Sequence, residues 1–187
     1  MRLEDRRNAE IARYTPEYWG VMRVWRQDIV RDWLKTAKDM VPSRPTYLDV
    51  GCGKWEAIAL GESLKYHARG AEVQDWLCAH PAVDLIPGAH DLSRYVTDAF
   101  DVVTCNDCLE HVLEEDIPAA LSEISRVAKT AILLGISQKP GPWHVCIQST
   151  EWWLDAIGEH MAGRAVVVFD DRIPPVKRPY LWVSITR

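Results

Sequence analysis

The stretch Tyr47-Leu-Asp-Val-Gly-Cys-Gly-Lys54 carries the most information about the fold of this chain. Tyr47 to Val50 is apolar and favours a β-strand, apart from one acid. Two glycines then permit a tight turn, and a helix-compatible segment runs from Trp55 to Lys65. A strand, a glycine turn and a helix in this order present backbone N–H groups and a helix N-terminus to a ligand. Taken alone, the stretch also fits an ordinary strand-to-helix turn.

Length and composition indicate a soluble protein with one domain. The 187 residues can bury a substantial core, and the apolar and charged fractions, 48% and 26%, are ordinary. No apolar run approaches the ~18 residues of a membrane span, and the charged N-terminus leads into no signal-type segment. We therefore expect a cytoplasmic protein without a membrane partner.

The charge balance argues against nucleic acid as a partner. The net charge of −5 gives the chain no general electrostatic attraction for a phosphate backbone. A local basic patch around Arg172, Lys177 and Arg178 stays open as an alternative. The sequence does not fix the oligomeric state.

The five cysteines predict neither a disulfide framework nor a metal site. Cys105-Asn-Asp-Cys108 has the C-x-x-C spacing with His111 nearby, and His144 with Cys146 could be imagined as further ligands. However, Cys105 ends an apolar strand, where a small side chain is commonly buried. We therefore favour packing for these cysteines and expect no metal ligands.

The N-terminal part of the chain reads as a helical cap. Thr15-Pro16-Glu17 has the pattern of a helix start, with a capping hydroxyl, a proline in the first turn and an acid. Apolar residues follow with helical spacing, at positions 18, 21, 22, 25, 29, 30, 33, 34 and 37. The helix should end before Val41-Pro42. Within one domain, we expect a cap over 1–44 and a core over 45–187.

Strands and helices alternate through the core. Helices are expected over 117–127 and 151–161, the second capped by Ser149 or Thr150. Strands are expected over 47–50, 72–76, 83–86, 100–105, 131–136, 165–169 and 180–185. Alternation predicts a largely parallel sheet, whereas the last two strands, joined only by 170–179, suit an antiparallel hairpin. The segment 77–82 is too short for a helical crossover. Either its helix is reduced to a turn, or 71–78 is helical and a strand is misplaced.

Several of these stretches resemble the class I S-adenosylmethionine-dependent methyltransferases, in particular the compact type 11-like enzymes that act on small molecules. The resemblance covers roughly residues 45–137. It rests on Leu48-Asp-Val-Gly-Cys-Gly53, Phe100-Asp-Val-Val103, Asp107-Cys-Leu-Glu-His-Val112 and Glu123-Ile-Ser-Arg-Val127. It implies a Rossmann-like, seven-stranded, mostly parallel sheet with an antiparallel last strand and helices on both faces. S-adenosylmethionine is the implied cofactor.

The resemblance also assigns residues to the cofactor. They are Asp49, Gly51, Gly53, Asp75, Ala89, His90, Asp91, Leu92, Asn106 and Asp107. Asp49 and the two glycines would lie at the amino-acid portion of the cofactor. Asp75 would accept both ribose hydroxyls, as a carboxylate with paired acceptors can, with Asp84 as the competing choice.

The remaining implied contacts concern the adenine and the methyl-transfer region. The segment 89–92 would lie at the adenine, and Asn106 with Asp107 would line the transfer region. The sequence departs from the family pattern at two places. Trp55 stands where the family has a third glycine, and either closes the site or packs under the loop. Gly88 or Ala89 stands where many members carry an acid for the adenine amino group.

Methyl transfer is an in-line displacement, so alignment and desolvation can supply much of the rate. A base is needed only where the acceptor loses a proton, and His144, His111 and Glu110 are the candidates. His144 follows a rigid loop after the fifth strand, where it could instead bond a backbone carbonyl. Glu110 and His111 are expected to begin a helix after the fourth strand. There Glu110 could simply interact favourably with the positive end of the helix dipole.

Among the nine tryptophans, Trp143 beside His144 is the preferred substrate contact. Trp19, Trp25 and Trp33 have helical spacing and are expected to pack the cap on the core. Trp152 and its neighbour Trp153 cannot both face one way, so one of them should lie near the surface or a cleft.

These patterns favour methyl transfer to a small molecule, at oxygen or nitrogen rather than carbon. The chief alternative is a non-catalytic protein that binds the cofactor as a regulatory or partner subunit. A nucleic-acid methyltransferase is less favoured because Asn106-Asp-Cys-Leu109 replaces Asn-Pro-Pro-Tyr and no Pro-Cys pair occurs. A nicotinamide dehydrogenase is excluded because Glu56 stands where G-x-G-x-x-G needs glycine.

Overall fold

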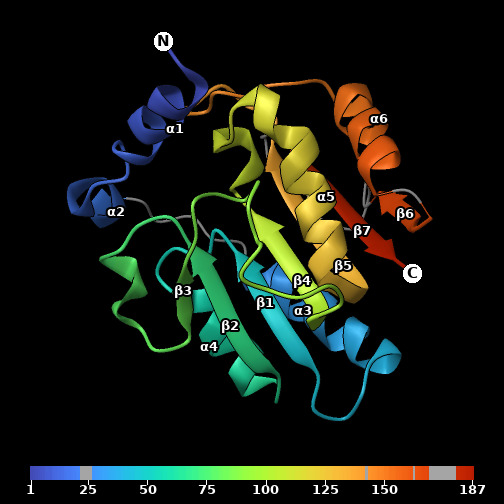
Figure 1. Ribbon diagram of the computed structural model, residues 1–187. Helices are drawn as coiled ribbons and strands as arrows, with labels where there is room; N and C mark the ends of the chain where they lie inside the picture. The colour runs from blue at the N-terminus through green and yellow to red at the C-terminus, as the bar shows by residue number, and fades with distance from the viewer. Residues whose placement is uncertain (22–26, 142, 162, 169–179) are drawn as a thin grey trace.

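The computed structural model describes residues 1–21, 27–141, 143–161, 163–168 and 180–187 (Figure 1). These residues form a seven-stranded sheet in the order β3-β2-β1-β4-β5-β7-β6. The strands are β1 (Thr46–Val50), β2 (His67–Glu72), β3 (Val83–Leu85), β4 (Phe100–Asn106), β5 (Ala128–Ser137), β6 (Ala165–Val168) and β7 (Tyr180–Thr186). The first five pair in parallel, and β7 runs antiparallel between β5 and β6. The predicted fold class is confirmed.

Helices cover both faces of the sheet, as Figure 1 shows. The helices are α1 (Leu3–Ile11), α2 (Pro16–Val21), α3 (Gln27–Ala37), α4 (Glu56–Ser63), α5 (Ile117–Val127) and α6 (Thr150–His160). Short 3₁₀ turns are η1 (Lys38–Met40), η2 (Leu77–Ala79), η3 (Leu109–His111) and η4 (Glu114–Asp116). Helices α5 and α6 pack on one face, and α3 and α4 on the other.

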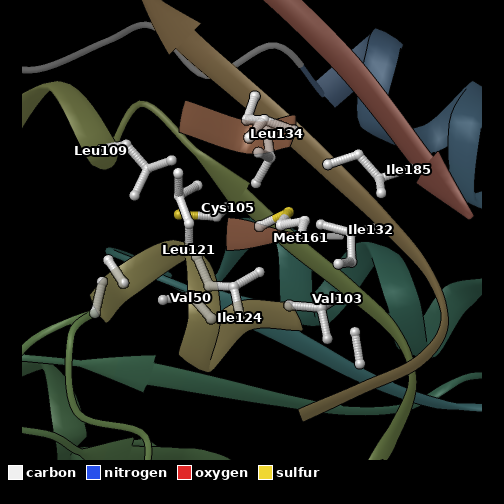
Figure 2. Packing of buried hydrophobic residues seen from close by; sticks show 14 of the residues in the cluster. Val50, Val103, Cys105, Leu109, Leu121, Ile124, Ile132, Leu134, Met161 and Ile185 are labelled. Carbon is white, nitrogen blue, oxygen red and sulfur yellow. The ribbon is translucent and has the colours of Figure 1, made fainter. Parts of the chain in front are cut away.

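The larger core lies between the sheet and helices α5 and α6. The apolar residues of α5 recur at helical spacing and are all buried: Ile117, Ala120, Leu121, Ile124 and Val127. Figure 2 shows part of this stripe against strand residues that include Val103, Cys105, Ile132 and Leu134. The α5 bounds are those expected from the sequence, because the stripe has a clear period and Pro118 suits the first turn.

Helix α3 belongs to the core layer on the opposite face. Val30, Trp33, Leu34 and Ala37 are buried, which agrees with the expected packing of Trp33. The Trp33 indole donates to Ser184 Oγ over 2.9 Å, and the Tyr66 hydroxyl donates to the Leu34 carbonyl over 2.7 Å. These bonds join α3 to β7 and to the segment before β2.

The predicted second strand was wrong. Expected over 72–76, it spans His67–Glu72 instead. A Cβ at Gly70 would overlap Cys52 Sγ and approach Ile58 Cδ1 to 2.7 Å. Only glycine fits so close to the neighbouring chain, and strand propensity, which disfavours glycine, cannot anticipate that contact. The crossover to β3 contains only the turn η2, so the first alternative holds, with the helix reduced to a turn, and 71–78 is not an α-helix.

A second correction concerns the segment after β4. Glu110 and His111 do not begin a helix but lie in η3, and α5 begins only at Ile117. Two predicted caps are confirmed: Trp152 N donates to Ser149 Oγ over 3.2 Å, and Tyr18 N donates to Thr15 Oγ1 over 3.3 Å.

Some sequence expectations fall outside the described residues. They are the continuity of the cap helix through 22–26, the packing of Trp25, the Trp19 side chain, the end of the sixth strand at Phe169, the 170–179 connection and the basic patch of Arg172, Lys177 and Arg178. Within the described ranges, no helix is both long and apolar enough to cross a membrane.

Candidate active site

The glycine loop after β1 lies at the carboxyl edge of the parallel strands, on the side where Figure 1 shows α1 and α2. Gly51 and Gly53 have φ angles of +73° and +50°. The Gly51 amide donates to the Ala71 carbonyl over 2.9 Å, and a Cβ on Gly51 would lie 2.6 Å from Cys108 Sγ. The loop is therefore confined between the ends of β2 and β4, where a side chain would not fit.

Trp55 shows why the family pattern has glycine at its position. Its φ is +70°, a left-handed conformation that costs an ordinary residue roughly 1–2 kcal/mol. The indole Nε1 donates to the Leu77 carbonyl over 2.8 Å, and the ring lies 5.1 Å from that of His80. Trp55 thus packs against the turn after β2, a placement that the sequence did not suggest.

Glu72, at the end of β2, is a candidate site residue that sequence reasoning missed. Its Oε2 accepts from Gly53 N over 2.9 Å and its Oε1 from Val73 N over 2.7 Å. The residue is 5% exposed, and burial raises the pKa of its carboxyl group. Glu72 was missed because the second strand was expected over 72–76, which made Glu72 the first residue of the strand and not the last.

The two acids considered for the ribose, Asp75 and Asp84, have surroundings that differ from those of Glu72. Asp75 is exposed in the turn beyond β2. Asp84 is held by structural partners: Arg69 Nε and the Tyr95 hydroxyl donate to its Oδ2, and Arg94 pairs with its Oδ1. Glu72 is the acid that contacts the glycine loop.

Asp49 lies in a buried polar chain beneath that loop. The Thr104 hydroxyl donates to Asp49 Oδ1, and the Tyr47 hydroxyl lies 2.7 Å from Thr104 Oγ1. Because the Thr104 proton is used on Asp49, Tyr47 is the donor in the second bond. Burial raises the pKa of Asp49 to about 7. A cation placed beside this carboxylate would relieve the cost of its burial.

The other expected cofactor residues lie along the same edge or in a nearby turn. Asn106 ends β4, and neither amide atom has a hydrogen-bond partner among the described residues. Asp107 follows with a φ of +48° and donates its N–H to the Gly135 carbonyl. The 89–92 segment is a turn in which Gly88 bridges to Asp91. Ala89 and Leu92 are buried there, His90 is partly buried, and Leu92 N donates to Glu123.

The three candidate bases, Glu110, His111 and His144, lie together although they come from two separate segments. Glu110 and His111 are in η3, and His144 is in the loop after β5. Each offers a nitrogen or carboxylate oxygen within 4.8 Å of the other two. The Glu110 carbonyl accepts from the backbone N–H groups of residues 145 and 146, over 2.9 and 3.0 Å, and so joins the segments.

Both imidazoles are oriented by backbone carbonyls. His111 Nδ1 lies 3.0 Å from the Trp143 carbonyl, and His144 Nδ1 lies 2.8 Å from the Lys139 carbonyl. The loop-pinning contact considered for His144 is therefore present. A carbonyl only accepts, so each Nδ1 carries the proton and each Nε2 keeps its lone pair.

The cluster is electrostatically unusual. Burial, with a smaller contribution from Asp107, raises the pKa of Glu110 to about 8. Burial and the neighbouring His144 lower the pKa of His111 to about 4. At neutral pH the His111 imidazole is uncharged and can accept a proton or coordinate a cation.

The N-terminal segment closes over this cluster with aromatic side chains, Tyr14 from the α1–α2 connection and Tyr18 from α2. The Tyr14 ring meets the His111 ring at 5.5 Å, and the Tyr18 ring lies 6.4 Å from that of Trp143. Arg13 lies over the Trp143 indole at 5.6 Å. Trp143 is 40% exposed, so the preferred substrate contact is at the surface of the site, whereas Trp153 is buried in the core.

Ion pairs rather than a buried apolar face hold α1 in place. Helix α1 has no buried residue. Arg7 Nε donates to Asp116 Oδ2 over 2.8 Å, and Arg6 pairs with Glu115. Gln74 Nε2 donates to the Ile11 carbonyl over 2.5 Å on the other side. The cap is thus attached both to η4 and to the turn after β2.

Comparison with known proteins identifies the class that this fold and site define. The profile of a family described as a methyltransferase domain matches residues 22–164, and the chain belongs to that family. Together with its fold, this makes it a class I S-adenosylmethionine-dependent methyltransferase. A search of curated proteins gave no match.

Solved structures share the fold at low sequence identity. The 1,6-didemethyltoxoflavin-N1-methyltransferase of Burkholderia thailandensis is 15% identical, with a TM-score of 0.72, over 100% of this chain and 91% of that one. A TehB-like methyltransferase of Corynebacterium glutamicum is 13% identical, with a TM-score of 0.63, over 98% of both chains. The CurJ carbon methyltransferase is 11% identical, with a TM-score of 0.66, over 86% of this chain and 53% of its own.

Proposed function

We propose that this protein transfers a methyl group from S-adenosylmethionine to a small molecule, at oxygen or nitrogen rather than carbon. The observation that carries the proposal is the pair of imidazoles of His111 and His144, beside Glu110, at the same sheet edge as the glycine loop. Methylation of an O–H or N–H acceptor releases a proton, and an imidazole held through Nδ1 offers its Nε2 lone pair to take it.

The residues at the glycine loop fit the cofactor. Gly51 and Gly53 leave room for close approach, because side chains there would be strained or would clash. Asp49 offers a buried carboxylate for a cationic amine, and Glu72 offers acceptor lone pairs for hydroxyls. The buried amide of Asn106, unpartnered among the described residues, is available to a ligand at the end of β4.

S-adenosylmethionine, when bound, supplies a methyl group on a sulfonium centre that an in-line nucleophile can displace. The role of the protein is then alignment, exclusion of water and acceptance of a proton. The Nδ1 contacts of His111 and His144 fix both rings, and the lone pair of either Nε2 can receive the proton. Tyr14, whose ring packs against that of His111, limits access of water to the cluster.

Several features favour a small acceptor over nucleic acid. The cap lies close over the base cluster and is attached at both sides, and the net charge is −5. The Burkholderia relative, which spans the whole chain, is named for methylation at a nitrogen of a small heterocycle. Because a carbon methyltransferase is among the proteins with a similar fold, carbon is retained as a competing acceptor atom.

The test has two stages. Calorimetry with S-adenosylmethionine and S-adenosylhomocysteine measures binding, and transfer of a labelled methyl group is then followed into separate small-molecule and nucleic-acid fractions of a cell extract. We expect binding of both ligands and label in the small-molecule fraction only. A His111→Asn variant should bind the cofactor and lose transfer, as a base should.

Each alternative has its own outcome. Binding without transfer into any fraction supports the regulatory or partner subunit. Label that enters the nucleic-acid fraction and is released by nuclease supports a nucleic-acid methyltransferase. Failure to bind either ligand would overturn methyl transfer altogether. Mass spectrometry of the labelled product distinguishes oxygen and nitrogen acceptors from carbon.

A further inference from the structure

We infer that Glu110, His111 and His144 form a binding site for a divalent transition-metal ion with three protein ligands. The site involves none of the cysteines that were weighed from the sequence, and it replaces the expectation that the chain has no metal ligands. Cys105 packs in the core instead, below α5 (Figure 2).

The ligand atoms are close enough to share one ion. One nitrogen or oxygen from each residue lies within 4.8 Å of the other two. Zinc binds nitrogen and oxygen at about 2.0–2.2 Å, so two of its ligands are separated by at most about 4.4 Å. The 4.8 Å limit lies close to this separation, so binding of an ion requires the three atoms to move only slightly closer together.

The two histidines are already oriented as metal ligands are. In metal sites, one ring nitrogen usually donates to a carbonyl or carboxylate, which fixes the tautomer and frees the other for the ion. His111 and His144 each place Nδ1 on a backbone carbonyl, at 3.0 and 2.8 Å. Their rings are perpendicular neighbours, with centroids 4.7 Å apart. Nε2 is the ligating atom that this arrangement leaves on each ring.

Glu110 supplies a buried carboxyl group whose ionised form such an ion would stabilise. The residue is 0% exposed, and its Oε1 accepts from Ser137 N over 3.2 Å. Its Oε2 is buried and has no hydrogen-bond partner in the described ranges. No lysine or arginine within those ranges forms an ion pair with Glu110. A buried carboxylate without a compensating group is costly, and a bound cation provides that compensation.

The donor set indicates the kind of ion. Two imidazoles and one carboxylate suit zinc and neighbouring first-row transition ions, whereas magnesium and calcium prefer oxygen ligands alone. Three protein ligands leave at least one coordination position open. If the proposed methyl transfer holds, on which this role rests, an oxygen or nitrogen of the acceptor can occupy that position and lose its proton more readily. With the ion bound, both Nε2 lone pairs bind the metal, so this proton passes to solvent water rather than to a histidine.

The test uses protein stripped with a chelator and dialysed, without S-adenosylmethionine. Titration calorimetry with zinc chloride measures stoichiometry and affinity, and cobalt(II) reports its ligands through its visible absorption. We expect about one zinc per chain, not displaced by millimolar magnesium. His144→Asn should weaken zinc binding at least ~10-fold, and Glu110→Gln should do the same.

Two control variants sharpen the result. His67→Gln removes an exposed histidine at the opposite end of β2 and should leave zinc affinity unchanged. Cys108→Ser should also leave it unchanged, and loss of binding in that variant would overturn the proposed ligand set in favour of a cysteine site. His144 is on a loop and partly exposed, so its variant remains informative even if Glu110→Gln fails to fold.

Zinc binding that survives both ligand substitutions, or no zinc binding at micromolar concentrations, would overturn the inference. The result is separable from the proposed function, because zinc is titrated without cofactor and cofactor is titrated without zinc. A protein that binds zinc but neither cofactor ligand would retain this site and lose the proposed reaction.

Discussion

The Glu72 carboxylate accepts a hydrogen bond from the Gly53 amide over 2.9 Å, which joins the end of β2 to the glycine loop that follows β1. The bond places an acid at the edge of the sheet where the carboxyl ends of the parallel strands β1 and β2 lie. Ligands bind at this edge in open α/β sheets. One buried side chain therefore both shapes the loop and presents acceptor atoms to a ligand.

Replacing Glu72 tests which acid serves the cofactor. Glu72→Gln keeps an acceptor for Gly53 but removes the charge, so the fold should persist while S-adenosylmethionine affinity falls ~10-fold or more. Asp75→Asn, at an exposed position, should change that affinity less than ~2-fold. Titration calorimetry with S-adenosylmethionine on both variants measures the two changes in affinity. A larger loss in Asp75→Asn would return the ribose role to Asp75.

A side chain at Gly51 should damage the loop. Gly51→Ala places a Cβ at a φ of +73° and 2.6 Å from Cys108 Sγ. We expect at least ~1–2 kcal/mol of lost unfolding free energy from the left-handed conformation, plus the cost of the contact. Urea denaturation measures it. The matched control is Gly158→Ala in α6, where a Cβ meets nothing within 4 Å and should stabilise by roughly 0.5–1 kcal/mol.

Asp49 should make the stability of the cofactor-free protein fall as pH rises. Its pKa is about 7 in the folded protein, against an ordinary value of 3.8, with burial as the main cause. Between these values the folded state holds a proton that the unfolded state releases, so unfolding is favoured progressively from pH 4 to pH 7. The effect is on the order of 4 kcal/mol and is constant above that range.

The variant Asp49→Asn should remove this dependence. Unfolding free energies are measured with urea at several pH values. From pH 4 to pH 7, the wild-type value should fall relative to that of the variant. The same variant should bind S-adenosylmethionine less tightly at pH 8, because the ionised carboxylate is lost. A difference that does not vary with pH would contradict a raised pKa at Asp49.

The attachment of α1 should depend on Arg7. Since the helix has no buried residue, Arg7→Gln removes a principal anchor and leaves the buried Asp116 carboxylate without its ion pair. We expect amide exchange over residues 3–11 to accelerate ~10-fold or more, while β4 stays protected. Arg2→Gln, which removes only an exposed pair within the helix, is the control. Equal exchange in both variants would show that the ion pairs do not hold the cap.

Much of the fold could be predicted because it depends on local patterns. The bounds of α5 follow from one apolar stripe and one proline, and β4 follows from a continuous buried run. The antiparallel end of the sheet follows from a connection too short for a crossover. By contrast, β2 contains a glycine that fits only because Cys52 and Ile58 pack against it, and no local pattern reports that contact.

The sequence by itself determined the order of strands and helices, the glycine loop at 51–53 and the family to which it points, because these depend on neighbouring residues. The tertiary structure alone decided that Glu72 meets that loop, and that His144 joins Glu110 and His111. These contacts depend on strand register and on hydrogen bonds between distant segments. The physical reason is that packing at the sheet edge decides which side chains from distant segments meet, and the spacing of residues along the chain does not contain that information.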